Sequence, residues 1–597
     1  MGNLPVFTAT RPLAEAAVCA VGPPAFTDPA RRSLRALGAT TVESVPAGER
    51  GQLAVACLGL GKVTSDTVWA DLCPEADVAD EATAQAATGV MHVHGRRDGR
   101  PLGLAVDYTA TCAAVATVQG LLAALLGQVR GGGATHVTCG ADRAALLAVS
   151  QYIAAAGAPE AEAVVLEPGG PPFTAACGTR FELEALEPAT WAGFWRGLGA
   201  PEAAIRTGWR PFQFRYAIAC APLPEELHAT TRAASWARIR QAAGASGAEV
   251  CRLHTLADRV TEASAGAPWT YVPLAPIRVP PSPMASRCES ARPLSGFTVL
   301  EAGRRIQAPL AAHLLGLLGA DVIRVEPPGG DPLRGMPPCC SDISARWLAL
   351  NRGKRALQID IKSPAGQAEL RELIADADVF LHNWAPGKAE RFGLDADHLA
   401  AVNPRLVYAH TSGWGGRLPD APIGTDFMVQ ARTGVGEAAR PADEPTAPSL
   451  MTLIDVLGGL LGAEAVLAAL LLRERTRHGV RVESSLLGAA ETLTAPALRR
   501  AAAGREARRP AGFRRPLPTA DGWMTPADGS ARAANARAGH LGRLTSHEAV
   551  AVLRDQGLTA TVVATDLAAL PADPRLRGAL TRDRYGSLVV PSPWRFE

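Results

Sequence analysis

The stretch GTDFMVQARTGVG (424–436), followed by LMTLIDVLGGLLGAEAVLAALLLRERTRHGVRVESS (450–485), predicts the element around which this chain folds. From Leu460 to Leu472 the only charged residue is Glu464. A basic cluster closes the run: Arg473, Arg475, Arg477 and His478. An acid at the front and bases at the back of an apolar run fit the dipole of a helix. We therefore predict a long buried helix followed by the strand RVESS.

Asp455 stands at the start of this helix and has two compatible interpretations. An Asp before an apolar run is usually a helix N-cap, because its side chain accepts hydrogen bonds from the first backbone N–H groups. A helix start also favours a carboxylate anion, and a carboxylate that is held in place can act as a nucleophile.

Composition limits the class of protein. The chain has 597 residues, enough for two or more domains, and 47% of them are hydrophobic, which predicts a globular fold with a large core. The formal net charge of +2 gives no reason to expect a nucleic acid or a membrane as partner. Lysine is rare, and three of the four lysines lie within one short segment: Lys354, Lys362 and Lys388.

The cysteines indicate a reducing compartment. The chain has eleven of them, without the CxxC spacing of metal sites and without a regular disulfide framework. The first residues, MGNLPVFTAT, lack the basic and apolar regions of a signal peptide. We expect a cytoplasmic protein with no metal site and no tightly bound cofactor.

The order of predicted elements occurs twice, with a period of roughly 310–350 residues. The matched stretches are DEATAQAATGV (80–90) with TDFMVQARTGV (425–435), LLAALL (121–126) with VLAALL (466–471), and VPPSPM (279–284) with VPSPWRF (590–596). In this alignment Gln85 matches Gln430 and Asp107 matches Asp455. The sequence therefore predicts a diverged tandem duplication of one fold.

Strand and helix patterns alternate in both copies, which predicts an α/β fold with a parallel sheet in each. We place the first copy at residues 1–285, with a helical, Trp-rich small domain at about 182–262, and the second at 286–597. The Pro-rich stretch 271–286 is the expected linker. The first copy has no counterpart of residues 329–415, so neither copy looks complete by itself.

Positive residues gather between residues 346 and 391. They are Arg346, Arg352, Lys354, Arg355, Lys362, Lys388 and Arg391, interleaved with Asn351, Asn383 and Trp384. Cations beside a flat ring suit a ligand that carries phosphates and a purine. The alternative is a solvated basic surface.

Six motifs of the second copy resemble, in family order, the class III CoA-transferases of the CaiB/BaiF type, which include formyl-CoA transferase, carnitine CoA-transferase and the α-methylacyl-CoA racemases. The motifs are LGADVIRVEPPGGD, LNRGKRALQIDIKSPAG, DVFLHNWAPGKAERFGLD, NPRLVYAHTSGWG, GTDFMVQARTG and the Asp455 helix with its strand. The first copy resembles the later half of the family together with a shortened beginning.

The resemblance implies a fold and a set of site residues. It implies a large Rossmann-like domain and a smaller α/β domain in each copy, with the two copies interlocked as a pseudo-dimer. Asp455 would be the nucleophile that forms an aspartyl anhydride and then an aspartyl-CoA thioester, and Gln307 would lie beside the reacting carbonyl. Seven residues would line the CoA groove: Asn351, Arg352, Lys354, Arg355, Asn383, Trp384 and Arg391.

Three positions depart from the family pattern. Thr425 stands where the racemases have a His, and a threonine cannot take a proton from carbon at neutral pH, so racemization is not expected. The glycine-rich flap is not visible, since the nearest region is ARRPAGFRRPLPTADGW (507–523). Pro327 and Pro328 replace a basic residue that many members carry after the strand.

These observations favour an acyl-CoA:carboxylate CoA-transferase whose partners are an acyl-CoA and a carboxylic acid, present as a monomeric pseudo-dimer or a homodimer. The alternatives are a racemase-like or lyase activity on acyl-CoA, and a pseudoenzyme that binds CoA or a partner subunit without turnover. We expect one competent site, because the first copy lacks the CoA-groove segments. Asp107 is expected to be a helix cap.

Overall fold

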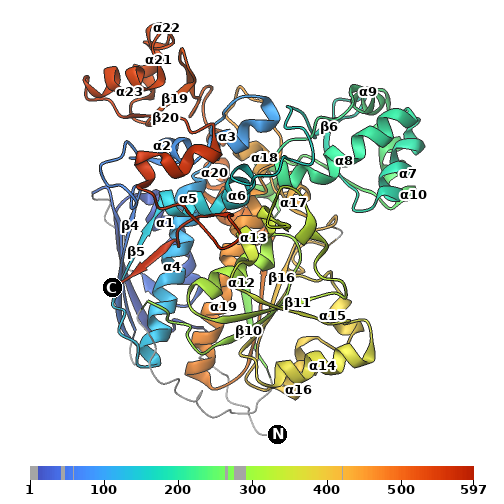
Figure 1. Cartoon of the computed structure of the whole chain (residues 1–597), viewed down its shortest axis with the longest axis vertical. Helices are drawn as coiled ribbons and strands as arrows, with labels where there is room; N and C mark the ends of the chain where they lie inside the picture. Colours follow the sequence, from blue (N-terminus) through green and yellow to red (C-terminus); the bar gives the residue numbers. More distant parts are fainter. Residues whose placement is uncertain (1–10, 42–47, 58–59, 263–265, 275–290, 420) are drawn as a thin grey trace.

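The computed structural model describes residues 11–41, 48–57, 60–262, 266–274, 291–419 and 421–597. It is an α/β protein with two main sheets, one from each copy, on either side of shared central helices (Figure 1). Most of the expected linker 271–286, and with it the boundary between residues 285 and 286, lies outside the described residues, so the domain limits stay a prediction.

The sheet of the first copy has six strands in the order β2-β1-β3-β4-β5-β23. Its elements are β1 (Ala16–Val21), α1 (Pro24–Ala36), β2 (Thr40–Thr41), β3 (Gly51–Cys57), β4 (Gly61–Val68), α2 (Glu81–Ala87), α3 (Val90–Gly95), α4 (Tyr108–Val129), β5 (His136–Gly140), α5 (Ala141–Ala148) and α6 (Ser150–Ala156). Strand β3 pairs antiparallel with both β1 and β4. The sheet of this copy is therefore mixed: β1 pairs in parallel with β2 and β4 with β5, while the β3–β4 hairpin adds antiparallel neighbours.

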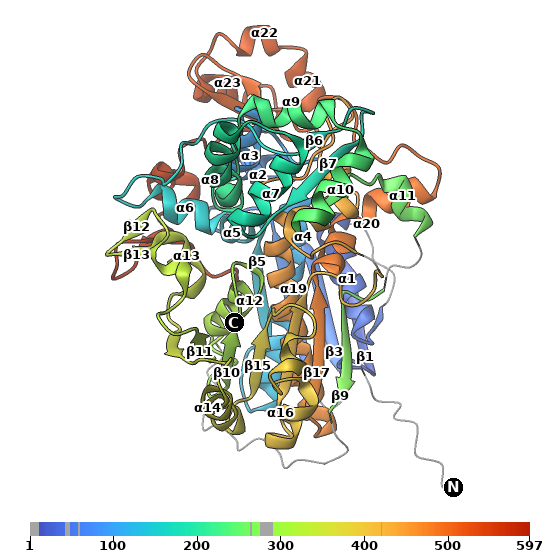
Figure 2. The ribbon, with the colours of Figure 1, turned by 90° about the vertical axis from the view of Figure 1, so that its right-hand side faces the viewer.

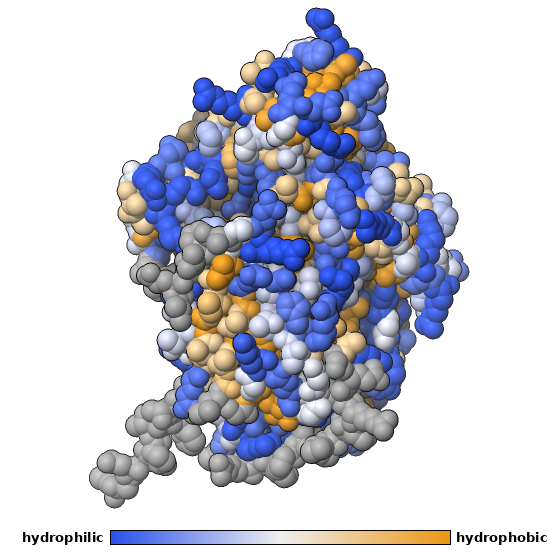
Figure 3. All heavy atoms as spheres, turned by 90° about the vertical axis from the view of Figure 1, so that its left-hand side faces the viewer, coloured by the Kyte–Doolittle hydropathy of each residue, from blue (hydrophilic) through white to orange (hydrophobic). Residues whose placement is uncertain are grey.

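One face of this first sheet is open to solvent. Residues along β1, β3 and β4 alternate between buried and more accessible, as expected when helices cover only one face. Hydrophilic residues dominate this side of the molecule, with smaller hydrophobic groups between them (Figure 3).

The sheet of the second copy has seven strands in the order β14-β11-β10-β15-β16-β17-β9, and only β9 runs antiparallel to its neighbour. Its elements are β10 (Thr298–Ala302), α12 (Gln307–Leu317), β11 (Asp321–Glu326), α13 (Ala345–Asn351), β14 (Arg355–Gln358), α14 (Pro364–Ala375), β15 (Val379–His382), α15 (Lys388–Arg391), α16 (Ala396–Val402), β16 (Val407–Ser412), α17 (Asp426–Arg432), α18 (Val435–Ala438), α19 (Leu453–Thr476), β17 (Val480–Ser485) and α20 (Leu486–Ala502). Helices α14 and α16 cover one face and α12 and α19 the other, so strands such as β15 are buried throughout (Figure 2). The predicted parallel sheet is confirmed here.

Each copy lends a strand to the sheet of the other. Strand β9 (Trp269–Pro273) of the first copy pairs with β17, and β23 (Trp594–Phe596) at the end of the second copy pairs with β5. Strands β9 and β23 thus hold equivalent places in the two sheets. Residues 279–284, which the sequence analysis matched with 590–596, lie outside the described residues. This exchange confirms the predicted interlocked pseudo-dimer.

Helices α4 and α19 pack against each other at the centre of the shared core (Figure 1). The helix predicted from the opening stretch is confirmed, and it ends with Arg473 and Arg475 in its last turn. Both helices are long and apolar enough to cross a membrane, but 100% and 94% of their most apolar windows are buried inside the protein.

Each copy also carries a small domain with a three-stranded antiparallel sheet. In the first copy it comprises β6 (Phe173–Thr174), β7 (Arg180–Glu184), α7 (Pro188–Leu198), α8 (Glu202–Ile218), α9 (Glu225–Ala233), α10 (Trp236–Ser246) and β8 (Glu249–Arg252) around an aromatic core that includes Trp191 and Trp195. In the second it comprises β18 (Leu517–Pro518), β19 (Trp523–Pro526), α21 (Ala531–Asn535), α22 (Ala538–Leu541), α23 (Ser546–Arg554) and β20 (Ala560–Val562). Each packs on the other copy: β7 and β8 contact α17, and β19 and β20 contact α2.

Candidate active site

Asp455 lies in the first turn of α19, and it is not the helix cap. The cap is the Asp426 carboxylate, which accepts hydrogen bonds from the backbone N–H groups of Ile454 (2.8 Å) and Asp455 (2.7 Å). The N-cap position itself is held by Thr452, whose side chain makes no capping bond. The expectation that Asp455 caps the helix is therefore wrong, and its carboxylate remains available for chemistry.

A buried network fixes Asp426. The Gln430 side-chain amide donates to its second oxygen, and that amide is itself held at both ends by the backbone of Ser449. Burial raises the pKa of Asp426 to about 6, although the N–H donors around it lower that pKa. Asp426 thus has the hydrogen bonds that stabilise its ionised form.

Asp455 has the opposite surroundings. In the described part of the chain no group donates a hydrogen bond to its carboxylate, and the residue is only partly accessible. Burial raises its pKa well above the ordinary value, and the Asp426 carboxylate raises it further. The Arg305 guanidinium lowers this pKa, and Glu184 adds to the rise. A desolvated carboxylate without donors is a stronger base and nucleophile than a solvated one.

The small domain of the first copy forms a wall of this site. Glu184, at the end of β7, accepts hydrogen bonds from the Thr425 hydroxyl (2.7 Å) and from Arg215 (3.0 Å). Tyr216 on α8 is close enough for its phenol and the Asp455 carboxyl to influence each other, and its ring lies 5.4 Å from the guanidinium carbon of Arg305.

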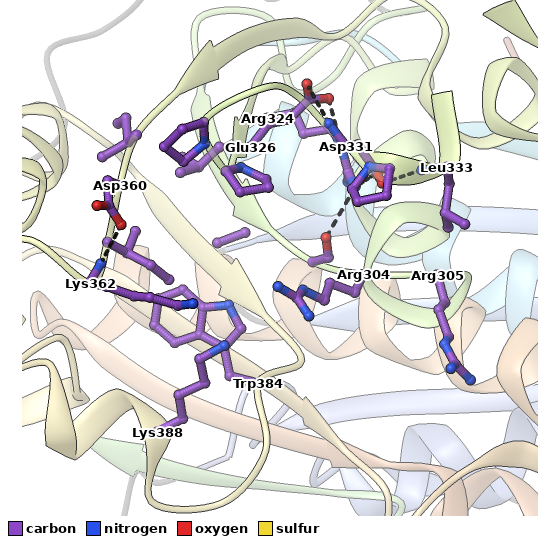
Figure 4. Close-up of a pocket in the computed structure, with 18 residues that line it drawn as sticks. Arg304, Arg305, Arg324, Glu326, Asp331, Leu333, Asp360, Lys362, Trp384 and Lys388 are labelled. Atoms are coloured by element: carbon purple, nitrogen blue, oxygen red, sulfur yellow. Dashed lines mark hydrogen bonds and ion pairs between the residues drawn. The ribbon is translucent and has the colours of Figure 1, made fainter. Parts of the chain in front are cut away.

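A cavity of about 480 Å³ opens at the carboxyl ends of β10, β11 and β15 (Figure 4). The chain runs from β10 to β11 and β14 on one side and then crosses to β15 on the other side of β10. This reversal of strand order is the switch point where ligands of parallel α/β sheets bind. Five cations, three acids and one indole are among the residues that line the cavity: Arg304, Arg305, Arg324, Lys362, Lys388, Glu326, Asp331, Asp360 and Trp384. Arg304, Lys362 and Lys388 gather around Trp384 (Figure 4).

Three of the predicted site residues lie at the cavity or beside Asp455. Trp384 lines the cavity. Asn383 holds the main chain of Arg304 from both sides, accepting from its N–H (2.9 Å) and donating to its carbonyl (3.0 Å). Gln307 begins α12 and packs on Gly458, one turn after Asp455; its amide makes a long bond of 3.4 Å to the carbonyl of Ser412.

Lys354 does not face the cavity. Its ammonium is buried and donates to Glu301 (3.1 Å), to the carbonyl of Pro309 (2.8 Å) and to Asn351 (2.8 Å). All three of its N–H directions are used inside the protein. Lys354 and Asn351 are thus bonded to each other inside the protein and do not line the cavity. Their contact with CoA stays a prediction.

The other three predicted residues are also outside the cavity lining. Arg352 donates to the carbonyl of Leu588 (3.0 Å), and Arg355 forms an exposed ion pair with Asp321. Arg391 is exposed on the short helix α15. The sequence analysis did not include Arg304, Arg305, Lys362 and Lys388 among the site residues, although all four line the cavity. The rarity of lysine and the paired arginines after the first strand of the second copy were the signals for them.

The first copy repeats the capping network without a counterpart of the Asp455 carboxylate. Glu81 takes the place of Asp426: it accepts from the N–H of Thr109 (2.8 Å) and of Ala110 (2.9 Å), and Gln85 donates to it (2.8 Å). The two capped N–H groups belong to Thr109 and Ala110 in the first copy and to Ile454 and Asp455 in the second. The residue that corresponds to Asp455 is therefore Ala110. The alignment of Asp455 with Asp107 is therefore wrong by three residues.

Asp107 is not a capping residue either. It occupies the N-cap position of α4, but its side chain makes no capping bond and pairs with Arg514 (2.7 Å) instead. Arg514 is buried and also pairs with Asp528 (2.8 Å). This arginine comes from the region 507–523 that replaces the expected flap. Within the described residues, the start of α4 thus carries an ion cluster of Asp107, Arg514 and Asp528.

Comparisons with known proteins agree with the duplication. A family model described as CoA-transferase family III matches residues 18–287 and again residues 294–574. The beta subunit of the succinyl-CoA–L-malate CoA-transferase of Chloroflexus aurantiacus is 40% identical over 200 residues, which are 32% of this chain and 49% of that protein. The succinyl-CoA:glutarate CoA-transferase of Mus musculus is 35% identical over 206 residues, 34% of this chain and 47% of that protein.

The chain thus spans about half the length of these curated relatives. Among solved structures, a CAIB/BAIF family protein from Brucella suis is 27% identical and has a TM-score of 0.47, covering 51% of this chain and 93% of that one.

Proposed function

The chain belongs to the CoA-transferase family III, and from this premise we propose that it transfers CoA from an acyl-CoA to a carboxylic acid with Asp455 as the nucleophile. The observation that carries the proposal is the pairing at the start of α19. Asp426 takes over the capping bonds, which leaves the Asp455 carboxylate desolvated and without donors. The relatives named above, which transfer CoA between acids, support the same reaction class.

In the first half of the proposed reaction, an Asp455 oxygen attacks the thioester carbonyl. The C–S bond breaks, CoA leaves as the thiolate, and an acyl-aspartyl anhydride remains. The thiolate then attacks the aspartyl carbonyl of the anhydride. This step releases the donor acid as its carboxylate and leaves Asp455 as a CoA thioester.

The second half repeats these steps with the acceptor. The acceptor carboxylate attacks the aspartyl-CoA thioester and expels the thiolate, which then attacks the acceptor carbonyl of the new anhydride. The new acyl-CoA leaves and the Asp455 carboxylate is restored. No oxidant, reductant or net proton is required.

Each tetrahedral intermediate needs a donor for its oxyanion. The N–H groups of Ile454 and Asp455 are bonded to Asp426, so the first turn of α19 does not supply them. Gln307 is the best-placed side chain, because it packs on Gly458 and its amide makes only one long bond. We assign the oxyanion contact to its Nε2.

The cavity at the strand ends is the proposed CoA site. Lys362, Lys388 and Arg304 supply charge for phosphates, and Trp384 supplies a flat surface for the purine. Arg305 also lines this cavity, and its charge lowers the pKa of Asp455. The first copy lacks both the nucleophile and the groove segments, which supports one site per chain.

Among the alternatives, a racemase-like or lyase reaction finds little support. Such a reaction needs a base beside Asp455, whereas the Thr425 hydroxyl donates its hydrogen bond to Glu184. A pseudoenzyme that only binds CoA or a partner subunit is the alternative that the experiment below must separate. A cytoplasmic location and the monomeric or homodimeric state remain predictions.

The test is to trap the aspartyl intermediate. The parent protein, incubated with acyl-CoA and hydroxylamine, should carry a hydroxamate on the peptide that contains Asp455, detected by mass spectrometry. Asp455→Asn should keep the fold, measured by thermal unfolding, and should lose both the adduct and CoA transfer. Asp455→Glu is the geometric control, since it retains a carboxylate but moves it by one methylene. Transfer by Asp455→Asn within tenfold of the parent would refute the assignment.

A further inference from the structure

His382, His410 and Glu483 lie side by side at the carboxyl ends of β15, β16 and β17. Backbone pairing places His382 opposite His410 and His410 opposite Glu483. The two imidazole rings stack, with their centroids 4.7 Å apart and their planes inclined by 22°. Nδ1 of His410 lies 3.4 Å from Oε1 of Glu483, and the His410 side chain is only 14% exposed. The proposed reaction uses none of these three residues.

This row of side chains reaches the cavity through the main chain of Trp384. Nε2 of His410 lies 3.1 Å from the Trp384 carbonyl oxygen, and the Trp384 N–H donates to Nδ1 of His382 at 3.3 Å. The indole packs against the His382 ring, with 4.7 Å between the centroids, and lies beside Lys362 and Lys388 in the cavity (Figure 4). Both polar groups of the Trp384 main chain are therefore bonded to histidine side chains.

The partners of His410 determine which of its nitrogens carry protons. A backbone carbonyl and an ionised carboxylate can only accept hydrogen bonds, so both nitrogens of His410 must donate and the ring is an imidazolium. The His410 hydrogen bond is also the main reason why the pKa of Glu483 is lowered. His382 is the opposite case, because its Nδ1 accepts from Trp384 and the proton is on Nε2, 2.6 Å from the Tyr408 hydroxyl. Burial lowers the pKa of His382 well below its ordinary value, which keeps this ring neutral.

Trp384 needs these side chains because it lies beyond the end of β15 (Val379–His382), where the hydrogen bonds of the sheet no longer hold the chain. A ring that binds a ligand must keep a fixed direction, since ordering it during binding would lower the affinity. The bonds from His382 and His410 supply this order before a ligand arrives.

We propose that His410 is a positioning residue for CoA binding: oriented by Glu483, it holds the Trp384 main chain so that the indole is presented to the purine of CoA. The inference rests on the CoA site proposed above and adds to it a chain of hydrogen bonds that runs from β17 to the cavity. His410 acts through Trp384, without contact to CoA.

The first measurement is the affinity for CoA by calorimetry, which requires no turnover. His410→Phe keeps a flat ring against His382 and removes both donors. It should weaken CoA binding about fivefold to tenfold, the change expected when a buried carbonyl loses its hydrogen bond. His398→Phe is the matched control, because His398 on α16 also pairs with a carboxylate, Asp395, but is exposed. It should leave the affinity unchanged.

Glu483 tests the orientation of the His410 ring. In Glu483→Gln the amide can donate to Nδ1 of a neutral His410, and Nε2–H still faces the Trp384 carbonyl. CoA affinity should therefore stay within about twofold of the parent. Glu483→Leu has a similar size but forms no hydrogen bond, and it should weaken CoA binding as His410→Phe does. Equal losses in the two Glu483 variants would overturn the inference.

The second comparison uses a Trp384→Leu background, which removes the flat ring and keeps an apolar side chain in its place. His410→Phe should cause no further loss of affinity there, because its effect passes through the indole. Thermal unfolding shows whether each variant is folded, and the two Glu483 variants decide the question if Trp384→Leu is not. An equal loss from His410→Phe in both backgrounds would overturn the inference. Unchanged CoA affinity in Trp384→Leu would also overturn it, while the role proposed for Asp455 would stand.

Discussion

Replacing Asp426 by Asn tests whether the cap of α19 also controls the reactivity of Asp455. Asp426 accepts hydrogen bonds at both oxygens, from two backbone N–H groups on one side and from Gln430 on the other. An Asn has one acceptor oxygen, so at least one buried donor loses its partner. The free energy of unfolding should fall by about 1–3 kcal/mol, the cost of one buried unsatisfied donor.

The same change acts on the pKa of Asp455. The Asp426 carboxylate raises that pKa, so its removal should lower it. The ionised nucleophile then persists to lower pH, and the acidic limb of the profile of kcat/KM against pH should move to lower pH. The measurements are this profile and a urea denaturation curve.

The duplication supplies the matched control. Glu81→Gln removes the same charge and the same acceptor from the equivalent network of the first copy, beside Ala110 rather than a nucleophile. It should cost a similar free energy and leave the pH profile unchanged. An unchanged profile in Asp426→Asn, or an equal shift in Glu81→Gln, would refute the link between cap and nucleophile.

Three further results are expected. The double variant Lys362→Ala and Lys388→Ala should weaken CoA binding measured by calorimetry, by a factor that shrinks as salt is raised, because phosphate contacts are screened. Lys354→Met should instead lower the free energy of unfolding by about 3 kcal/mol, since it leaves the buried Glu301 without one partner. Burial raises the pKa of Glu464 to about 8, whereas the same group in the unfolded chain has a pKa of 4.5. The folded protein therefore keeps a proton that the unfolded chain loses, and the free energy of unfolding should fall as pH rises between these values. Glu464→Gln should remove that slope and be more stable than the parent at pH 8. Ala110→Asp should leave the number of trapped acyl groups at one per chain, and two would show that the first copy still binds a thioester.

The large features of the fold could be predicted from the sequence because they depend on periodic patterns. The apolar run with basic residues at its end predicts α19, and the repeated order of elements predicts two interlocked copies. The mixed sheet of the first copy could not be predicted in this way. Strands β3 and β4 are short runs whose pattern shows that they are strands but not which neighbours they pair with.

The site residues were harder to predict, because side chains that are close in the sequence can point to different sides of the fold. The segment 346–391 passes through α13, β14, α14 and β15, so its cations face different sides of the sheet. Lys354 points inward and Lys362 lines the cavity. The cap of α19 comes from another helix, α17, and no local spacing could assign it. The misplaced match of Asp455 came from pairing like residues rather than keeping the constant spacing set by Gln85 and Gln430.

The two copies differ in a way that separates structural roles from chemical ones. Both keep an acid and a Gln that cap a central helix, although only the second copy has a carboxylate at the position of Asp455, so the network itself does not depend on that carboxylate. The first copy has lost the segment that forms the groove, and with it helices like α14 and α16, which explains why the outer face of its sheet is open. It still supplies Glu184 and Tyr216 to the site of its neighbour. Fusion makes this division possible, because a wall and a nucleophile encoded in one chain no longer need to occur in both halves.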